Sequence, residues 1–213
     1  MKNLFRFPNV NKGKSVSISY KKKRFIGEVI IGNEYSFAFD DLVVVDIGAN
    51  IGTFSLWIYD RAKKIYAIEP VKEVLDCLDE TIKDSNLTKI KTYQLAISDG
   101  NYLGMMKENG DPHMGAWRIN SQGKYPTEIM SLGKFFEKEG IEHADIVKMD
   151  VEGEEEKILL ADDFPKDKIS TIIGEDHDLR NEEDKRSLKP ALDKIGFEYF
   201  VCPHHHFMGR RRI

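Results

Sequence analysis

A run of valines that leads directly into a glycine turn constrains the fold of this chain more than any other segment. Residues 43–54 read VVVDIGANIGTF, which predicts a buried strand, a tight turn and the start of a helix. Gly48 and Gly52 allow the backbone of the turn to approach a ligand where a Cβ atom would clash. A turn of this kind after the first strand is typical of nucleotide-binding clefts in α/β proteins.

The residues around these glycines favour one class of ligand. A dinucleotide-binding turn needs a glycine where this chain has Asn50, and the carboxylate of Asp46 would repel a pyrophosphate. That carboxylate suits a cofactor with a cationic sulfonium and an amino group, so the segment predicts S-adenosylmethionine and disfavours a nicotinamide dehydrogenase. The expected contacts are Asp46, Gly48, Asn50, Gly52 and Thr53. The alternative is a tight turn without a ligand.

The rest of the chain predicts an α/β fold. From residue 42 onward, β-branched runs alternate with helical patterns, which is typical of a mostly parallel sheet with crossover helices. We expect strands over residues 42–47, 64–68, 91–97, 145–149, 169–173, 197–202 and 205–210. We expect helices over 53–63, 71–84, near 131 to 140, 154–160 and 182–195, the last kinked or broken at Pro190. The glycine-rich residues 100–130 are expected to be irregular.

The chain is expected to divide into two parts. Residues 41–213 form the cofactor-binding domain. Residues 1–40 contain short β-like runs at 15–20, 24–31 and 35–39, which predict a small β-rich appendage at one edge of the sheet.

Acidic residues also end the second and third expected strands. Glu69 can accept hydrogen bonds from both ribose hydroxyls of a nucleoside, although a glutamate at a strand end is often only solvated. Ser98 and Asp99 end the third strand, and Asp99 is expected to accept from the adenine amino group. The alternative for Asp99 is a simple turn into Gly100.

The fourth strand leads into a second unusual segment, IVKMDVEGE at residues 146–154. Asp150 and Glu152 are expected to face the same cleft as the glycine turn. There they could bind a metal ion, accept a proton from the substrate, or bind the amino group of the cofactor. Lys148 is out of place in an apolar central strand and needs a buried partner, for which these acids are the candidates.

Four segments of the chain resemble the FkbM family of S-adenosylmethionine-dependent methyltransferases: VDIGANIG (45–52), AIEP (67–70), AISD (96–99) and VKMDVEGE (147–154). The resemblance implies a seven-stranded Rossmann-like fold with helices on both faces of the sheet. It also implies methyl transfer, typically to a hydroxyl oxygen. It assigns cofactor contacts to Asp46, Gly48, Gly52, Glu69 and Asp99, and the reaction end to Asp150 and Glu152.

The chain departs from the family at one place. Such proteins often carry Leu-Asp before the fourth strand, where this chain has Leu132-Gly133, so no role of that aspartate can be transferred.

Methyl transfer is an in-line displacement, so an enzyme mainly positions the acceptor and removes its proton. His177, after the fifth strand, is the candidate general base because a neighbouring acid could orient it; the alternative is an exposed loop histidine. A second hypothesis is a divalent cation held by Asp150, Glu152, Glu175 and His177, which would lower the pKa of the acceptor.

A zinc site near the end of the chain is a weaker hypothesis. Cys202, His204 and His206 would share one face of an extended segment. Pro203 interrupts that segment and the sequence offers no fourth ligand, so a polar turn is favoured and no metal site is assigned.

Charge is unevenly distributed along the chain. Residues 1–24 contain eight lysines and arginines and no acid, and residues 210–212 are three arginines. These basic ends are either solvated surface or contacts to an anionic acceptor such as RNA, a nucleotide-linked sugar or a lipid-linked glycan. The sequence contains no recognisable RNA-binding module.

Composition completes the functional prediction. The two cysteines, Cys77 and Cys202, form no disulfide framework, and the sequence shows neither a signal peptide nor a run long enough to span a membrane. We therefore expect a cytoplasmic S-adenosylmethionine-dependent O-methyltransferase that acts on a hydroxyl of a sugar or small metabolite. Methylation of RNA or another polyanion, and cofactor binding without catalysis, are the alternatives. Nothing in the sequence indicates an oligomeric state.

Overall fold

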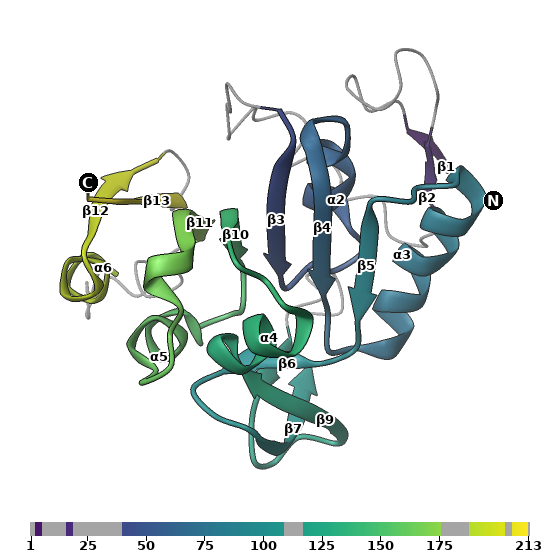
Figure 1. Cartoon of the computed structure of the whole chain (residues 1–213). Coiled ribbons are helices and arrows are strands. Elements are labelled where there is room, and N and C mark those ends of the chain that lie inside the picture. Colours follow the sequence, from purple (N-terminus) through teal and green to yellow (C-terminus); the bar gives the residue numbers. More distant parts are fainter. Residues whose placement is uncertain are drawn as a thin grey trace.

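The glycine turn lies at the carboxyl end of a central strand in the computed structural model, which describes residues 3–5, 16–18, 40–108, 117–175, 188–202 and 206–212. The large sheet runs in the order β12-β13-β11-β10-β3-β4-β5 (Figure 1). β11, β10, β3, β4 and β5 are mutually parallel, whereas β13 is antiparallel to both of its neighbours. The strands are β3 Leu42–Ile47, β4 Ala62–Ile68, β5 Ile90–Tyr93, β10 Ala144–Met149, β11 Ile169–Glu175, β12 Phe197–Val201 and β13 His206–Arg211. The sheet is mixed, and the expected parallel centre is confirmed.

Helices cover both faces of this sheet. Val44 and its neighbours on one face pack with residues of α2 and α3, and Val45 on the other face packs with residues of α4, α5 and α6. This alternation follows from the two-residue period of a strand that is buried on both sides. The helices are α2 Thr53–Ile58, α3 Lys72–Ser85, α4 Leu132–Glu139, α5 Glu155–Leu160 and α6 Lys189–Ile195, with short 3-10 turns η1 Tyr59–Arg61 and η2 Lys166–Lys168. No helix among the described residues combines the length and apolar character needed to cross a membrane.

Residues 100–130 correct the expectation of an irregular segment. They contribute most of a second sheet with the order β6-β9-β7-β8, and the expected strand 91–97 is divided between the two sheets. Gly104 marks close packing and not a loop, because a Cβ atom there would lie 2.2 Å from Cδ1 of Ile129 on the paired strand. The strands of this small sheet are β6 Ala96–Ser98, β7 Tyr102–Glu108, β8 Trp117–Ile119 and β9 Tyr125–Ser131.

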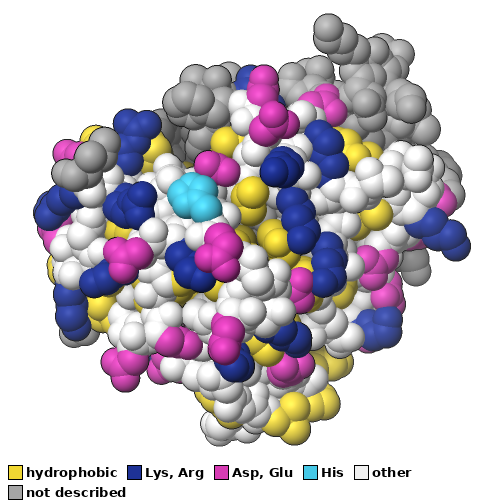
Figure 2. Space-filling view, in the orientation of Figure 1, with side chains coloured by type: hydrophobic (Ala, Val, Ile, Leu, Met, Phe, Trp, Pro, Cys, Tyr) yellow, Lys and Arg dark blue, Asp and Glu magenta, His cyan; other side chains and the backbone are white. Residues whose placement is uncertain are grey.

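The small sheet projects from the rest of the molecule. Figure 1 places it below α4, and Figure 2 shows apolar side chains exposed at this lower end. Tyr102, Leu103 and Tyr125 are the exposed large apolar residues of the small sheet.

Two helices differ from their expected lengths. The helix expected over 53–63 ends at Ile58, because Ala62 already pairs with Leu42 in the large sheet. Pro190 lies in the first turn of α6, where a proline removes no hydrogen bond within the helix. Residues 182–187 of the expected helix lie outside the described residues.

The beginning of the chain contributes a separate two-stranded sheet. β1 Asn3–Phe5 pairs antiparallel with β2 Val16–Ile18, and β2 contacts α3. β2 falls within the expected run 15–20, whereas the runs 24–31 and 35–39 lie outside the described residues. The division into an appendage and a cofactor-binding domain stays a prediction.

Candidate functional site

The glycine turn that follows β3 depends on left-handed backbone conformations. Gly48, Asn50 and Gly52 have φ values of 72°, 52° and 86°. A Cβ atom at Gly48 would lie 1.9 Å from the carbonyl oxygen of Asp150, and one at Gly52 would lie 2.3 Å from Cδ1 of Leu78. The two glycines thus allow the turn to touch the end of β10 and the side of α3.

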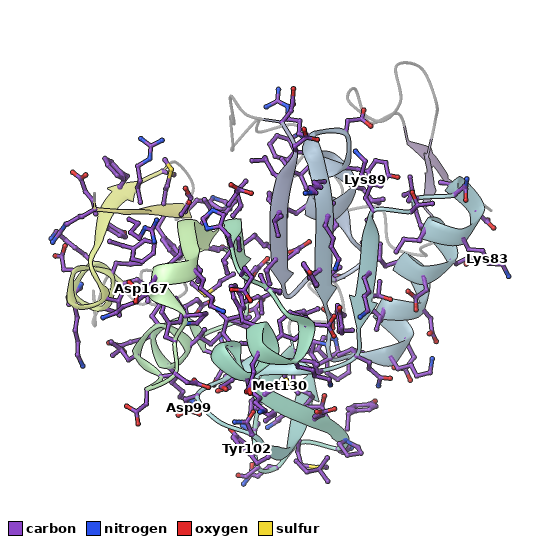
Figure 3. All side chains as sticks on the ribbon, in the orientation of Figure 1. Lys83, Lys89, Asp99, Tyr102, Met130 and Asp167 are labelled. Atoms are coloured by element: carbon purple, nitrogen blue, oxygen red, sulfur yellow. The ribbon has the colours of Figure 1, made fainter. Side chains whose placement is uncertain are left out.

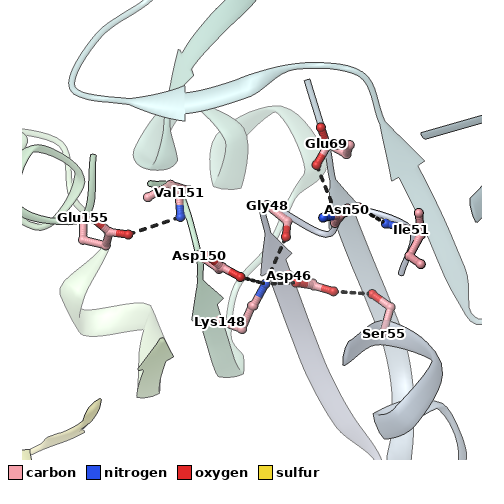
Figure 4. Close-up of polar contacts among 10 residues, drawn as sticks. All are labelled: Asp46, Gly48, Asn50, Ile51, Ser55, Glu69, Lys148, Asp150, Val151 and Glu155. Carbon is pink, nitrogen blue, oxygen red and sulfur yellow. Dashed lines mark hydrogen bonds and ion pairs between the residues drawn. The ribbon is translucent and has the colours of Figure 1, made fainter. Parts of the chain in front are cut away.

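Lys148 joins the glycine turn to the end of β10. Its ammonium donates to the carbonyl oxygen of Gly48 at 3.0 Å and lies 3.4 Å from Oδ1 of Asp46 and 3.5 Å from Oδ2 of Asp150 (Figure 4). Burial alone would lower the pKa of Lys148, but the carboxylates of Asp46 and Asp150 outweigh it, so the pKa is raised. The prediction of an acidic partner is confirmed for Asp150, which is 39% exposed, whereas the buried partner is Asp46, which was not among the expected candidates.

Asp46 lies beneath the turn and is fully buried. Its Oδ2 accepts a hydrogen bond of 2.6 Å from the hydroxyl of Ser55 on α2, and its Oδ1 faces the ammonium of Lys148. The carboxylate therefore connects β3 to both α2 and β10. Contact between Asp46 and a cofactor stays a prediction.

Glu69, at the end of β4, supports the turn from the other side. Its two oxygens accept from the backbone N–H groups of Asn50 at 3.0 Å and Val71 at 2.9 Å. Burial raises the pKa of Glu69 to about 7, although both of these hydrogen bonds oppose the shift. The side chain of Asn50 accepts from the N–H of Ile51, which stabilises its left-handed conformation. The proposed ribose contact of Glu69 is untested.

The raised pKa of Glu69 predicts a specific dependence of stability on pH. The folded state binds this proton more tightly than the unfolded state, whose pKa is close to 4.5. Stability from this group is therefore present at low pH and lost as the pH rises from about 4.5 through about 7, a change of about 3 kcal/mol. Urea unfolding of the wild type and Glu69→Gln between pH 5 and pH 8 measures it. The variant should show a flatter profile, and parallel profiles would contradict the prediction.

Ser98 links the small sheet to the turn after β10. Its buried hydroxyl donates to Oε2 of Glu154 at 2.6 Å, and Oε1 of Glu154 pairs with Lys157 at 2.8 Å. The neighbouring Asp99 is exposed, and its Oδ1 lies 3.3 Å from the hydroxyl of Ser98. An exposed carboxylate beside a buried hydroxyl is compatible with the predicted adenine contact, which stays a prediction.

The turn after β10 holds Glu152 in a left-handed conformation with φ of 55°. Glu155, which is buried, accepts from the N–H groups of Val151 at 3.2 Å and Gly153 at 2.9 Å and so fixes this turn. Oε2 of Glu152 lies 3.8 Å from Nη2 of Arg118, which comes from β8 of the small sheet.

Several residues of this site were not predicted from the sequence. Ser55 and Glu155 lie close to the recognised motifs, so a search for side chains able to satisfy Asp46 and the turn after β10 would have indicated them. Arg118 carries no local signal, because only the unpredicted small sheet brings it beside Glu152.

The remaining residues predicted for the site lie in several different parts of the structure. Thr53 is buried at the start of α2, and Glu175, at the end of β11, pairs in register with His206 on β13. His177 and His204 lie outside the described residues. Among the residues that the structure does describe, no group of three His, Cys, Asp or Glu side chains is arranged to hold a metal ion. The divalent-cation hypothesis therefore gains no support.

The basic end at residues 210–212 is partly engaged within the protein. Arg211 donates to the carbonyl oxygen of Asp167 at 2.6 Å, and Arg212 pairs with the carboxylate of Asp193. These contacts favour the interpretation of this end as structured surface.

Comparison with known proteins identifies similar sequences and folds. The family described as methyltransferase FkbM domain matches residues 46–208, a range that includes both motif turns. No curated protein matches the chain.

Solved structures resemble the chain in fold. A methyltransferase FkbM from Methylobacillus flagellatus has a TM-score of 0.60 at 14% identity, over 89% of this chain and 48% of that one. The fibrillarin pre-rRNA processing protein of Methanococcus jannaschii has 0.56 at 16% identity, over 99% and 82%. A precorrin 8w decarboxylase from Methanobacterium thermoautotrophicum has 0.50 at 16% identity, over 82% and 83%. This chain thus spans about half the length of the first structure. The likeness confirms a methyltransferase-like α/β fold.

Proposed function

Because the chain belongs to the family of methyltransferases with an FkbM domain, we propose that it transfers a methyl group from S-adenosylmethionine to a hydroxyl of a sugar or small metabolite. The observation that carries the proposal is the position of Asp150. Its carboxylate is 39% exposed, lies beside the glycine turn and is oriented by a buried lysine. An accessible carboxylate at that place can contact an acceptor hydroxyl and take its proton.

The residues around the turn fit the proposed cofactor. Glu69 and Asp150 place two carboxyl groups beside the turn (Figure 4), which suit a ligand with a positive sulfonium and an amino group and disfavour a pyrophosphate. Each oxygen of Glu69 accepts one backbone hydrogen bond and keeps a lone pair for a ribose hydroxyl. When bound, S-adenosylmethionine supplies an activated methyl group.

The protein's own part in such a reaction is positional. Lys148 holds the carboxylate of Asp150 at a fixed place relative to the turn, and Glu155 fixes the turn that follows. Alignment of the acceptor oxygen with the methyl group is the main requirement of an in-line displacement.

Two measurements test the proposed function. Calorimetry should show binding of S-adenosylhomocysteine and none of NAD, and the reverse result would overturn the cofactor assignment. A labelled-methyl transfer screen across nucleotide sugars, RNA and a cell extract should label a hydroxyl compound. Labelled RNA would instead favour a polyanion methyltransferase. Cofactor binding without transfer to any fraction would favour a non-catalytic protein.

Replacing Asp150 with asparagine should reduce kcat by about 100-fold or more, because the amide cannot accept the acceptor's proton. Binding of S-adenosylhomocysteine should change by less than about threefold, since the amide keeps the size of the side chain. The matched control is Asp167→Asn, a change at an exposed carboxylate of η2 that should leave kcat unaltered. Unchanged turnover in Asp150→Asn would remove this residue from the reaction.

A further inference from the structure

Two positive side chains lie directly opposite each other on the small sheet. Lys107 of β7 pairs in register with Arg118 of β8, and both residues are exposed. Residues opposite each other on antiparallel strands project from the same face with Cβ atoms about 5 Å apart, and like charges in that arrangement destabilise a sheet. An anion bound between the two side chains would offset this repulsion.

The face that carries this cationic pair packs on the main body at one end and is exposed elsewhere, as at Leu103 and Glu128. Met106, Ala96 and Ile129 lie on the opposite face, where they form a small cluster of their own. Met130 and Ile97, which share the face of the cationic pair, pack in the core of the main domain. The pair therefore lies on the exposed part of the face by which the small sheet packs on the main domain.

Arg118 places the cationic pair at the reaction end of the site. Its Nη2 lies 3.8 Å from Oε2 of Glu152, in the turn that follows Asp150. This separation exceeds a hydrogen bond, so Glu152 neutralises Arg118 only in part. Lys107 forms no ion pair with any residue that the structure describes, and Lys124, just before β9, adds a third exposed positive charge at the same end of the sheet.

We propose that Lys107 and Arg118 bind a phosphate group of the methyl acceptor, which makes the acceptor a phosphorylated or nucleotide-linked sugar. This inference rests on the proposed methyl transfer for the role of the ligand as an acceptor. An arginine can donate two parallel hydrogen bonds to phosphate oxygens, and the lysine adds a compact charge. The hydroxyl to be methylated would then lie between this phosphate and Asp150.

The placement of the aromatic residues of the small sheet favours a small phosphorylated compound over RNA. Proteins that bind single-stranded RNA combine positive charge with aromatic side chains on which bases stack. Here Trp117 and Tyr125 pack edge to face, with ring centroids 5.0 Å apart, and they project from the face opposite Lys107 and Arg118. The cationic pair and the aromatic side chains are therefore separated.

The test uses pyrophosphate as the probe and calorimetry as the measurement, with S-adenosylhomocysteine present, at about 50 mM and about 200 mM salt. The variants are Lys107→Gln, Arg118→Gln and the double variant. The matched control is Lys83→Gln, because Lys83 is an exposed lysine of α3, remote from the small sheet (Figure 3). The double variant should bind pyrophosphate at least about tenfold more weakly than the wild type, and the control should not differ.

Each outcome is decisive. Equal pyrophosphate binding by the wild type and the double variant, or no binding by the wild type, would overturn the proposal. A uridine oligonucleotide that binds at least about 100-fold more tightly than pyrophosphate, and loses that affinity in the double variant, would overturn the small acceptor in favour of RNA. Failure to bind S-adenosylhomocysteine, with pyrophosphate binding intact, would overturn the proposed function and leave the anion site standing.

Discussion

Replacing Lys148 with methionine should lower the free energy of unfolding by about 3–5 kcal/mol, the largest effect we expect from any single substitution. Methionine keeps the approximate length of the side chain but leaves the fully buried carboxylate of Asp46 without a cation. Asp150 loses the same partner, and the turn loses the hydrogen bond to the carbonyl oxygen of Gly48. Urea unfolding followed by circular dichroism measures the loss.

A charge-free double variant separates this explanation from a general packing defect. Asp46→Asn combined with Lys148→Met removes both buried charges and should recover most of the lost stability. The matched control is Lys72→Met, because Lys72 pairs with Asp76 at 2.6 Å and both side chains are more than half exposed. An exposed pair of this kind contributes about 1 kcal/mol or less. Equal losses for the two lysines would show that burial of the Asp46 carboxylate is not what matters.

The central strands and the glycine turn could be predicted because their signals are local. The β3 strand has the bounds expected from its run of valines, and the turn after it follows from two glycines and a helix start. The end of α2 could not be predicted in the same way. Ala62 leaves the helical pattern because it pairs with Leu42, a contact that a window of local sequence does not contain.

The small sheet could not be predicted because its decisive contacts are distant in sequence. Gly104 and Pro126 are typical of loops, yet Gly104 is required by the side chain of Ile129, and Pro126 is an exposed residue of β9. The positive charges at Lys107 and Arg118 then acquire meaning only through the register of β7 with β8. The structure of residues 100–130 therefore depends on how β7 pairs with β8 and β9, which the local sequence does not specify.

The residues of the site also divide into those with a local sequence signal and those whose contacts depend on strand register. The acids at the strand ends and the misplaced Lys148 were recognisable from the motifs, since a buried charge requires a partner. Which acid it meets depends on the register of β10 with β3, in which Lys148 stands directly opposite Asp46. That register makes Asp46, which was predicted only as a cofactor contact, a buried anchor of the turn.

Gly48→Ala should have the second-largest effect, a loss of about 3 kcal/mol or more, because it combines two costs. The added Cβ atom would lie 1.9 Å from the carbonyl oxygen of Asp150, which directly follows the central strand β10 and is held to β3 by a hydrogen bond from its N–H to the carbonyl oxygen of Ile47. The φ of 72° adds about 1–2 kcal/mol for a residue with a side chain. Relief of the clash must separate the turn from β10, so kcat should fall together with stability.

Gly140→Ala provides the control that isolates the clash. Gly140 ends α4 with a φ of 62°, and a Cβ atom there would meet no atom within 4 Å. This variant has only the backbone cost of about 1–2 kcal/mol and should retain full methyl transfer. The difference in unfolding free energy between the two variants measures how tightly the glycine turn is pressed against the end of β10. If both variants lost the same stability, the contact between Gly48 and Asp150 would not be what requires a glycine, and the placement of Asp150 beside the turn would lose its physical basis.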